Sequence, residues 1–570
     1  MSDQRQISMF LAGRHYFVLW LLLVLFASLI GRAVYLQVLN QEFLLGEGSQ
    51  RQLRTIETPA YRGAIVDREG TTLAISTPVD SVWVNPQEAL LDPRGLVKVS
   101  ESLGLDGAQT LNRVQQRADR EFVYLKRRVE PALAQVAVQD TRGIYLQREY
   151  HRFYPAGEVA SHVLGFTDID DVGREGLELV YQDWLKANPG ERQILRDRMG
   201  SVVEDIAQVS ASRPGKDLQV SLDMRLQYIT YRSLARAIAR HNAVSGSAVL
   251  LDAPSGEILA LANLPSFNPN SRDKSRPANR RNRAVTDVFE PGSTIKPFTL
   301  AAALERGLFN HKSRINTAPG YMKVTGHAIK DHHNYGVLDL AGILRKSSNV
   351  GASKVAQAMQ AEELWQSLNA FGFGQPTGVS FPAESSGYLR HFTDWHPLDH
   401  ATVAFGYGLS VSTLQLARAY SVFAADGVLR PASMLMQDEV EPGQRVMSKK
   451  TARAVLAMME QVVGPKGTAR NAAVRGYRVA GKTGTVKKTA AGGYLEDSYV
   501  AVFAGIAPVS APRLVMVVMI DQPRQNGYYG GQVAAPVFSE VLTHALRLMN
   551  ISPDDLPAIR QIASSQENKV

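Results

Sequence analysis

The stretch Glu290-Pro291-Gly292-Ser293-Thr294-Ile295-Lys296-Pro297-Phe298 decides how most of this chain is interpreted. An apolar run continues from it to Leu304 and predicts a helix. A proline inside a helix costs about 3 kcal/mol unless it lies in the first turn, where no N–H partner is lost. Pro297 therefore predicts that the helix starts at or near Ser293. The Ser293 hydroxyl would then lie at the positive end of the helix dipole, with Lys296 one turn later on the same face.

Two further motifs follow in the chain, Ser347-Ser348-Asn349 and Lys482-Thr483-Gly484-Thr485. Each short motif alone is weak evidence, because Ser293 could merely cap a helix and the lysine motif could be a turn. A second Ser-x-x-Lys, Ser271-Arg272-Asp273-Lys274, lies in a polar run without apolar periodicity and indicates a solvated loop. Three motifs in this order, each in a suitable local context, indicate one active site.

The residue types suit an acyltransferase that uses lysine as its base. A serine hydroxyl is a poor nucleophile until a neighbouring base takes its proton. Lysine can be that base only if burial or nearby positive charge lowers its pKa, and the helix N-terminus and Lys482 would both lower the pKa of Lys296. Ser347 could relay a proton to the leaving amine, and Asn349 could hold a peptide backbone or orient Lys296. We therefore expect Ser293, Lys296, Ser347 and Asn349 to be catalytic.

The lysine motif follows Val479-Ala480 and predicts an exposed strand. Gly484 has no side chain, so a substrate backbone could lie against this strand as an added strand. Lys482 and Thr485 could then bind a terminal carboxylate. The expected substrate-binding residues are Lys482, Thr483, Gly484 and Thr485. The backbone N–H groups of Ser293 and Thr485 would form an oxyanion hole, in which each donor contributes roughly 3 kcal/mol.

These motifs resemble the set found in penicillin-binding proteins and serine β-lactamases. Other stretches resemble the pedestal motifs of class B penicillin-binding proteins: Arg62-Gly63-Ala64-Ile65-Val66-Asp67-Arg68-Glu69-Gly70, Leu73-Ala74, Arg152-Phe153-Tyr154-Pro155-Ala156-Gly157 and Gly173-Arg174-Glu175-Gly176-Leu177-Glu178. Three more resemble the division-specific, FtsI-type branch: Glu290-Pro291-Gly292-Ser293-Thr294, Phe405-Gly406-Tyr407-Gly408 and Tyr528-Tyr529-Gly530-Gly531.

The resemblance implies a peptidoglycan D,D-transpeptidase that crosslinks stem peptides through a serine acyl-enzyme during septal cell-wall synthesis. Ser293 would attack the penultimate D-Ala carbonyl, terminal D-Ala would leave, and the amine of a second stem would resolve the acyl-enzyme. β-Lactams would acylate Ser293 as substrate mimics. The step would need no metal and no soluble cofactor.

Four other functions compete with this one. A β-lactamase would need to hydrolyse its acyl-enzyme, and Glu362 and Glu363 do not match the loop motif of class A enzymes. A membrane-anchored β-lactam receptor would need a signalling segment, which the short N-terminal tail does not offer. A non-catalytic scaffold would have no use for Lys296 and Lys482 together. An elongation-specific class B transpeptidase stays open, because the chemistry of the two branches is the same.

Composition excludes several chemistries. The chain has 570 residues and no cysteine, so disulfides, Cys-ligated metals and thiolate catalysis are absent. The formal charge of +9 is mild for this length. The basic stretch from Arg272 to Arg283 lacks the interleaved aromatic residues of a nucleic-acid site, so no nucleic-acid partner is expected. Asp331-His332-His333 could suggest a metal, but no second ligand pair has suitable spacing. We interpret it as a solvated loop.

The N-terminus predicts one membrane span. Tyr16 to Gly31 is uncharged and almost wholly apolar, and Ala33 to Leu36 extends it past Arg32, which can snorkel at the interface. Arg5 and Arg14 precede the span, so the N-terminus is expected in the cytoplasm. The rival interpretation, a cleaved signal peptide, lacks a good small-x-small site. We expect a single-pass protein of the bacterial inner (cytoplasmic) membrane with a periplasmic catalytic domain.

The expected architecture is multidomain α+β: an N-terminal transmembrane helix, an extended mixed pedestal domain and a C-terminal penicillin-binding transpeptidase domain. Strand-like runs at both ends of the last domain predict an antiparallel sheet covered by helices, and the resemblance implies five strands. The expected limits are a cytoplasmic tail at 1–15, a signal anchor at 16–39, the pedestal or dimerisation-type domain at 40–214, the transpeptidase domain at 215–549 and a flexible tail at 550–570.

The region before Pro214 matches a pedestal and not a glycosyltransferase domain, so the chain is expected to crosslink glycan strands without polymerising them. The resemblance implies a membrane glycan polymerase of the FtsW type and other divisome membrane proteins as partners, besides the stem peptides and β-lactams.

Overall fold

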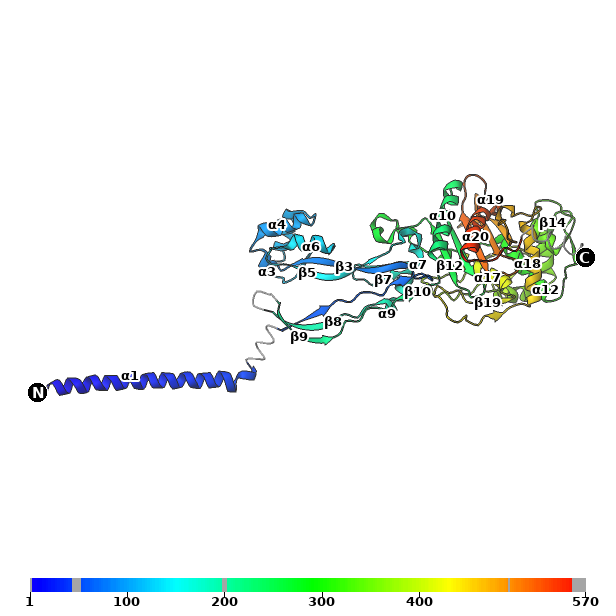
Figure 1. Ribbon diagram of the computed structural model, residues 1–570. Coiled ribbons are helices and arrows are strands. Elements are labelled where there is room, and N and C mark those ends of the chain that lie inside the picture. Colours follow the sequence, from blue (N-terminus) through cyan, green and yellow to red (C-terminus); the bar gives the residue numbers. More distant parts are fainter. Residues whose placement is uncertain (1–2, 44–52, 197–201, 491–492, 556–570) are drawn as a thin grey trace, which may run out of the picture. The chain divides into compact units, whose positions relative to one another are not determined.

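The computed structural model of the protein describes residues 3–43, 53–196, 202–490 and 493–555 (Figure 1). The chain forms two compact units. One comprises Met1–Ala60 and Ala187–Pro214, and the other comprises Tyr61–Lys186 and Gly215–Val570. The sequence-based limits at 214 and 215 coincide with one border of these units, and the domain limits as a whole stay a prediction.

The first unit contains a long N-terminal helix and a small sheet. Helix α1 (Asp3–Val34) continues into one π-helical turn, η1 (Tyr35–Leu39). Within the described residues, Arg14–Leu39 is the one helical segment long and apolar enough to span a membrane, and its large apolar side chains from Tyr16 to Ile30 are exposed. The sheet is antiparallel, in the order β1 (Leu53–Thr58), β8 (Gly190–Arg196) and β9 (Val202–Ser210).

The second unit begins with the pedestal strands. One mixed sheet contains β10 (Leu218–Gln219), β2 (Ile65–Val66), β3 (Thr72–Val84), β4 (Val123–Val129) and β5 (Ile144–Phe153), and β3 pairs with both β4 and β5. Three helices pack a separate small core against its far end: α4 (Pro93–Ser102), α5 (Gly107–Gln115) and α6 (Pro131–Val138). The mixture of strands and helices expected for the pedestal is confirmed.

The pedestal motifs meet at a buried ion cluster. Arg62 Nε donates to Glu178 Oε2 and Arg152 Nε donates to Glu178 Oε1, each over 2.6 Å, and all three side chains are at most 1% exposed. Arg62 also donates to the Glu178 carbonyl over 2.8 Å, and Arg152 donates to the Gly63 carbonyl over 2.7 Å. One residue from each of three motifs that are far apart in the chain therefore ties the base of the pedestal together.

The catalytic part of the unit is built on a five-stranded antiparallel sheet. Its order is β12 (Ile258–Leu264), β11 (Ser245–Asp252), β23 (Leu514–Asp521), β22 (Gly493–Ala507) and β21 (Ala480–Ala490). Every residue of β11 is buried, which explains its continuous small and apolar sequence. This sheet confirms the predicted fold class.

Helices cover both faces of this sheet (Figure 1). Helices α10 (Met224–His241) and α20 (Ala535–Leu548) pack on one face, and α17 (Thr413–Ala424) packs on the other. The remaining helices of the catalytic part include α12 (Lys296–Glu305), α13 (Leu340–Lys346), α14 (Asn349–Gln357), α15 (Ala361–Ala370), α16 (Pro397–Val403), α18 (Lys449–Val463) and α19 (Gly530–Val533).

Strand β21 begins at Ala480, where pairing with Ile506 starts. Strand β10 ends at Gln219 and pairs in parallel with pedestal strand β2, and Asp223 caps the N-terminus of α10. One expectation needs correction. The tail expected to be flexible from residue 550 is bound as far as Asp555: the Asp554 carboxylate accepts from the backbone N–H groups of Arg478 and Ser510, and the Asp555 N–H donates to the Gly476 carbonyl. Residues 1–2 and 556–570 of the two expected tails lie outside the described residues.

Candidate active site

Ser293 lies in a tight helical turn that leads directly into α12. The turn η5 (Gly292–Ile295) is a 3₁₀ turn, α12 starts at Lys296, and Pro297 occupies its first turn. The predicted helix start is therefore confirmed, because the proline lies where its missing N–H costs nothing. The Tyr420 hydroxyl donates to the Thr294 carbonyl over 2.7 Å and holds the turn from α17.

The nucleophile turn rests on the backbone of Gly406. Gly292 has a φ of +54° and its N–H donates to the Gly406 carbonyl over 3.1 Å. Gly406 has a φ of +89°, and a Cβ there would lie 2.1 Å from the Gly292 carbonyl oxygen. Nearby, the Gly408 N–H donates to Glu290 Oε1 over 2.8 Å. The stretch Phe405-Gly406-Tyr407-Gly408 therefore positions the turn that presents Ser293.

Lys296 is fully buried and faces the serine motif. Its Nζ donates to the Ser347 carbonyl over 2.6 Å, to Asn349 Oδ1 over 2.7 Å and to Ser347 Oγ over 3.2 Å. None of these three hydrogen bonds goes to Ser293. Burial holds the pKa of Lys296 well below its usual range, the charge of Lys482 lowers it further, and the charge of Asp331 raises it.

Lys482 reaches the same hydroxyl from strand β21. Its Nζ donates to Ser347 Oγ over 2.9 Å and to the Thr483 carbonyl over 3.1 Å. This side chain is also fully buried, and burial lowers its pKa to about 7. Ser347 therefore lies between the two amines, and its hydroxyl can exchange a proton with either of them.

The serine motif is held in an unusual backbone conformation. Ser347 ends α13 with a φ of +57°, which is rare for residues other than glycine and stores strain. Asp331 holds the next turn in place: its carboxylate accepts from the Ser348 hydroxyl over 2.5 Å and from the backbone N–H groups of Asn349 and Val350 over 2.5 Å and 3.0 Å. Asp331 thus anchors the N-terminus of α14.

Strand β21 is the outer strand of the sheet, with β22 as its ladder partner among the described residues. An outer strand can accept an added strand along its free edge. The structure shows why position 484 is glycine, and the reason differs from the substrate contact that the sequence suggested. A Cβ at Gly484 would lie 2.9 Å from the Pro291 carbonyl oxygen and 3.0 Å from Thr294 Cγ2, so the missing side chain makes room for the nucleophile turn.

The residues open into one cavity of about 690 Å³. Ser293, Ser347, Thr483 and Thr485 line it, while Lys296 and Lys482 lie buried behind Ser347. The Thr485 hydroxyl accepts from the Gly530 N–H over 3.0 Å. The cavity thus collects a nucleophile, two buried amines and the edge of a strand, which is a set suited to acyl transfer onto a serine.

Comparisons with known proteins show the family of the chain. A family model described as the penicillin binding protein transpeptidase domain matches residues 246–543, and one described as the penicillin-binding protein dimerisation domain matches residues 57–220. The probable peptidoglycan D,D-transpeptidase PbpC of Pseudomonas aeruginosa is 41% identical, with 100% of both chains covered. The peptidoglycan D,D-transpeptidase FtsI of Escherichia coli K12 is 41% identical, covering 97% of this chain and 95% of that protein.

The chain is a class B penicillin-binding protein. A solved structure supports the same assignment. The transpeptidase domain of Burkholderia pseudomallei penicillin-binding protein 3 superposes with a TM-score of 0.55 at 42% identity, covering 59% of this chain and 98% of that one. In this penicillin-binding protein the transpeptidase match at 246–543 lies within the second unit, whereas the dimerisation match at 57–220 includes residues of both units.

Sequence reasoning missed two contributors to the site. The expectation of a solvated loop at Asp331 is wrong for that residue: the exposed His332 and His333 that follow it line the cavity, and its own carboxylate holds the serine motif. Gly406 stood out in the sequence only as part of a family motif. Neither role could be found in the sequence, because each depends on a contact between segments that are distant in the chain.

Proposed function

We infer that this penicillin-binding protein is a peptidoglycan D,D-transpeptidase that acylates Ser293 with a stem peptide. The observation that carries the inference is the meeting of two buried lysines at one serine hydroxyl, 3.2 Å from Lys296 and 2.9 Å from Lys482, in the cavity that Ser293 lines. The relatives at 41% identity over nearly the whole chain are named for the same activity.

Acylation is proposed to begin with Lys296 as the base. Burial lowers its pKa, which favours the neutral form of the amine that can take the Ser293 proton while Oγ attacks the penultimate D-Ala carbonyl. The backbone N–H groups of Ser293 and Thr485 would stabilise the oxyanion, at roughly 3 kcal/mol for each donor. The scissile C–N bond then breaks, and the leaving D-Ala amine takes a proton through Ser347.

The substrate-binding residues are proposed to be Lys482, Thr483, Gly484 and Thr485. The donor peptide would lie along the free edge of β21, with its terminal carboxylate at Lys482 and Thr485. Asn349 is proposed to orient Lys296. Its Oδ1 accepts from the Lys296 amine over 2.7 Å, and its Nδ2 donates to the Lys330 carbonyl over 3.1 Å.

Covalent labelling tests this function. A fluorescent penicillin should label the full-length protein, and Ser293→Ala should abolish the label, since losing the nucleophile of such a unit typically costs about 10⁶ in rate. Ser271→Ala, in the other Ser-x-x-Lys, is the matched control and should be labelled like the wild type. Labelling of Ser293→Ala at the wild-type rate would show that the nucleophile is another residue.

A septal role is the proposed cellular setting, supported by the FtsI name of full-length relatives. Depletion of the protein from growing cells should produce filaments, whereas an elongation role would produce rounded cells. The segment Arg14–Leu39 would anchor the protein in the inner membrane, with the N-terminus in the cytoplasm and the catalytic domain in the periplasm. Protease added to spheroplasts should then digest the catalytic domain.

A separate glycan polymerase is the proposed partner. The dimerisation model accounts for residues 57–220, which leaves no room for a glycosyltransferase domain between the membrane segment and the transpeptidase domain. A membrane polymerase of the FtsW type, together with other divisome membrane proteins, would supply the glycan strands. The purified protein with the lipid-linked disaccharide-pentapeptide precursor should make no glycan polymer, and polymer formed by this chain alone would contradict the proposal.

A further inference from the structure

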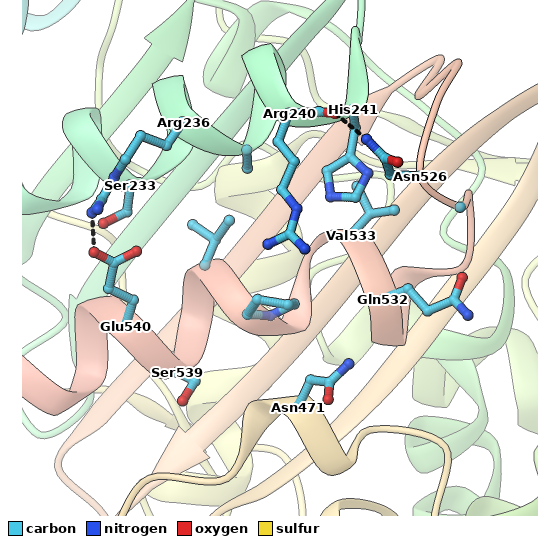
Figure 2. A pocket seen from close by; sticks show the side chains of 14 residues that line it. Ser233, Arg236, Arg240, His241, Asn471, Asn526, Gln532, Val533, Ser539 and Glu540 are labelled. Carbon is cyan, nitrogen blue, oxygen red and sulfur yellow. Dashed lines mark hydrogen bonds and ion pairs between the residues drawn. The ribbon is translucent and has the colours of Figure 1, made fainter.

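The transpeptidase domain has a second cavity beside the candidate active site, between α10 and α20 (Figure 2). Its volume is about 1020 Å³, at the upper end of the usual size of ligand sites. Asn471 and Gln532 line both this cavity and the active-site cavity. The two spaces are therefore neighbours with a shared wall.

The shared wall stands on the Thr483 side of the active site. The Thr483 hydroxyl lies 3.1 Å from the Thr468 hydroxyl, and Asn471 Nδ2 donates to the Gly531 carbonyl over 3.0 Å. In the proposed reaction the terminal carboxylate of the leaving D-Ala binds at Lys482 and Thr485, on the same strand as Thr483. The leaving group vacates this side, and the acceptor amine has to enter from it.

The second cavity contains a positive charge without a counter-ion. Arg236 pairs with Glu540, so these two charges cancel. Figure 2 shows Arg240, an exposed residue at the end of α10, reaching across the cavity toward α20, and its guanidinium has no ion-pair or hydrogen-bond partner among the residues that the structure describes. An unpaired guanidinium offers a fork of donors that fits a carboxylate.

A buried histidine adds a polar atom that faces the same space. His241 is only 5% exposed and lines the cavity. Its Nδ1 lies 3.0 Å from the Gln525 carbonyl, which can only accept, so Nδ1 carries the hydrogen. Nε2 has no partner within the described part of the chain and is left to bind a ligand group. With the amides of Asn471 and Gln532, the lining suits a peptide that carries a free carboxylate.

We propose that this cavity binds the acceptor stem peptide, with a carboxylate of that peptide at Arg240 and its amine directed past Asn471 and Gln532 toward the acyl-enzyme. This rests on the transpeptidase function proposed above. The amine attacks the Ser293 ester carbonyl, the new C–N bond forms, and the bond from the carbonyl carbon to Oγ breaks. The proton that the amine loses passes through the lysine base to the Ser293 oxygen.

The test separates the acceptor step from acylation. The full-length protein in detergent receives a thioester analogue of the D-Ala-D-Ala donor, whose thiol release reports acylation. It also receives a peptide acceptor with one primary amine and free carboxylates, or the same peptide with those carboxylates amidated. The ratio of aminolysed to hydrolysed donor, measured against acceptor concentration, reports acceptor binding independently of the acylation rate.

Arg240→Gln should raise the half-saturating concentration of the carboxylate acceptor about three- to fivefold, the effect of one partly exposed ion pair. The amidated acceptor should show no such change. Arg232→Gln is the matched control, because Arg232 is exposed on the same helix and does not line the cavity. It should behave like the wild type.

Three results would contradict the acceptor site. If Arg240→Gln changes neither acceptor, or changes both equally, Arg240 does not bind an acceptor carboxylate. If Arg232→Gln has the same effect as Arg240→Gln, the effect is one of general charge. Failure of the wild-type protein to release thiol would overturn the proposed function and the acceptor site with it, whereas normal thiol release with wild-type partition in Arg240→Gln overturns the acceptor site alone.

Discussion

At the scale of single residues, the candidate active site has two buried amines within hydrogen-bond distance of one hydroxyl. Burial lowers the pKa of both lysines because a charged amine loses its hydration. Arginine could not replace Lys296, since a guanidinium keeps its proton at every accessible pH. The low pKa of Lys296 therefore supports its role as the proposed base.

The pH dependence of acylation should reveal which charges tune Lys296. A general base works when neutral, so the acylation rate should fall as the pH drops through the pKa of Lys296. Lys482→Gln removes a positive neighbour, which raises that pKa and moves the acid limb to higher pH. Asp331→Asn removes a negative neighbour, which lowers the pKa and moves the limb to lower pH.

Stopped-flow measurement of acylation by a chromogenic β-lactam between about pH 5 and pH 9 would detect both shifts. This pH range covers the usual pKa values of catalytic bases. Lys487→Gln, on the exposed side of the same strand, is the control and should leave the limb in place. Shifts in the same direction for Lys482→Gln and Asp331→Asn would exclude the electrostatic explanation.

At the scale of secondary-structure elements, the position of Ser293 is set by what the turn η5 packs against. Strand β21 contacts the turn at Gly484, and the loop after α16 contacts it at Gly406. Both contacts join backbone to backbone, so a side chain at either glycine would displace the turn. The position of the proposed nucleophile relative to the proposed oxyanion donors therefore depends on two glycines that have no proposed chemical role.

Gly406→Ala should destabilise the protein by about 2–4 kcal/mol and greatly slow acylation, because the new Cβ would clash with the nucleophile turn in a left-handed backbone. Gly408→Ala is a matched control. Its φ of +77° is also left-handed, but its nearest neighbour would be Val403 Cγ2 at 3.9 Å, so it should cost only about 1 kcal/mol. Thermal unfolding and penicillin labelling measure both effects, and equal losses in the two variants would argue against the backbone contact.

At the scale of the whole molecule, the cluster of Arg62, Arg152 and Glu178 joins three separate segments of the chain at the base of the pedestal. Two arginines share one carboxylate away from water, where an unpaired charge is very costly. Such a cluster contributes less to net stability than to a single defined arrangement of the segments that meet there. It thus defines where the pedestal strands leave the catalytic domain.

Glu178→Gln should lower the free energy of unfolding by about 3–5 kcal/mol, since it removes the carboxylate that pairs with both buried guanidinium groups. Arg174→Ala, in the same motif, should cost less than about 1 kcal/mol, because its pair with Asp168 is exposed to solvent. Denaturant unfolding of the two variants would compare them. A loss as small in Glu178→Gln as in Arg174→Ala would show that the cluster is not a structural anchor.

Local sequence was sufficient for the features that depend on neighbouring residues. Pro297 placed the start of α12, the apolar run after Tyr16 predicted the spanning helix, and the strand-like runs at both ends of the catalytic domain predicted its sheet. The three motifs, in this order, carried the resemblance to penicillin-binding proteins. In these cases the physical cause lies within a few residues of the effect.

Only the tertiary structure decided which of these parts touch. Lys482 meets Ser347 across 135 residues and Arg62 meets Glu178 across 116, while Asp331 contacts Asn349 from a stretch that by itself indicates a solvated loop. The lysine motif predicted its strand, but packing shows another reason for the glycine in it. The missing side chain of Gly484 makes room for the nucleophile turn. Burial and long-range contact arise when distant segments pack together, so the lowered lysine pKa values and the geometry of the site are properties of the fold.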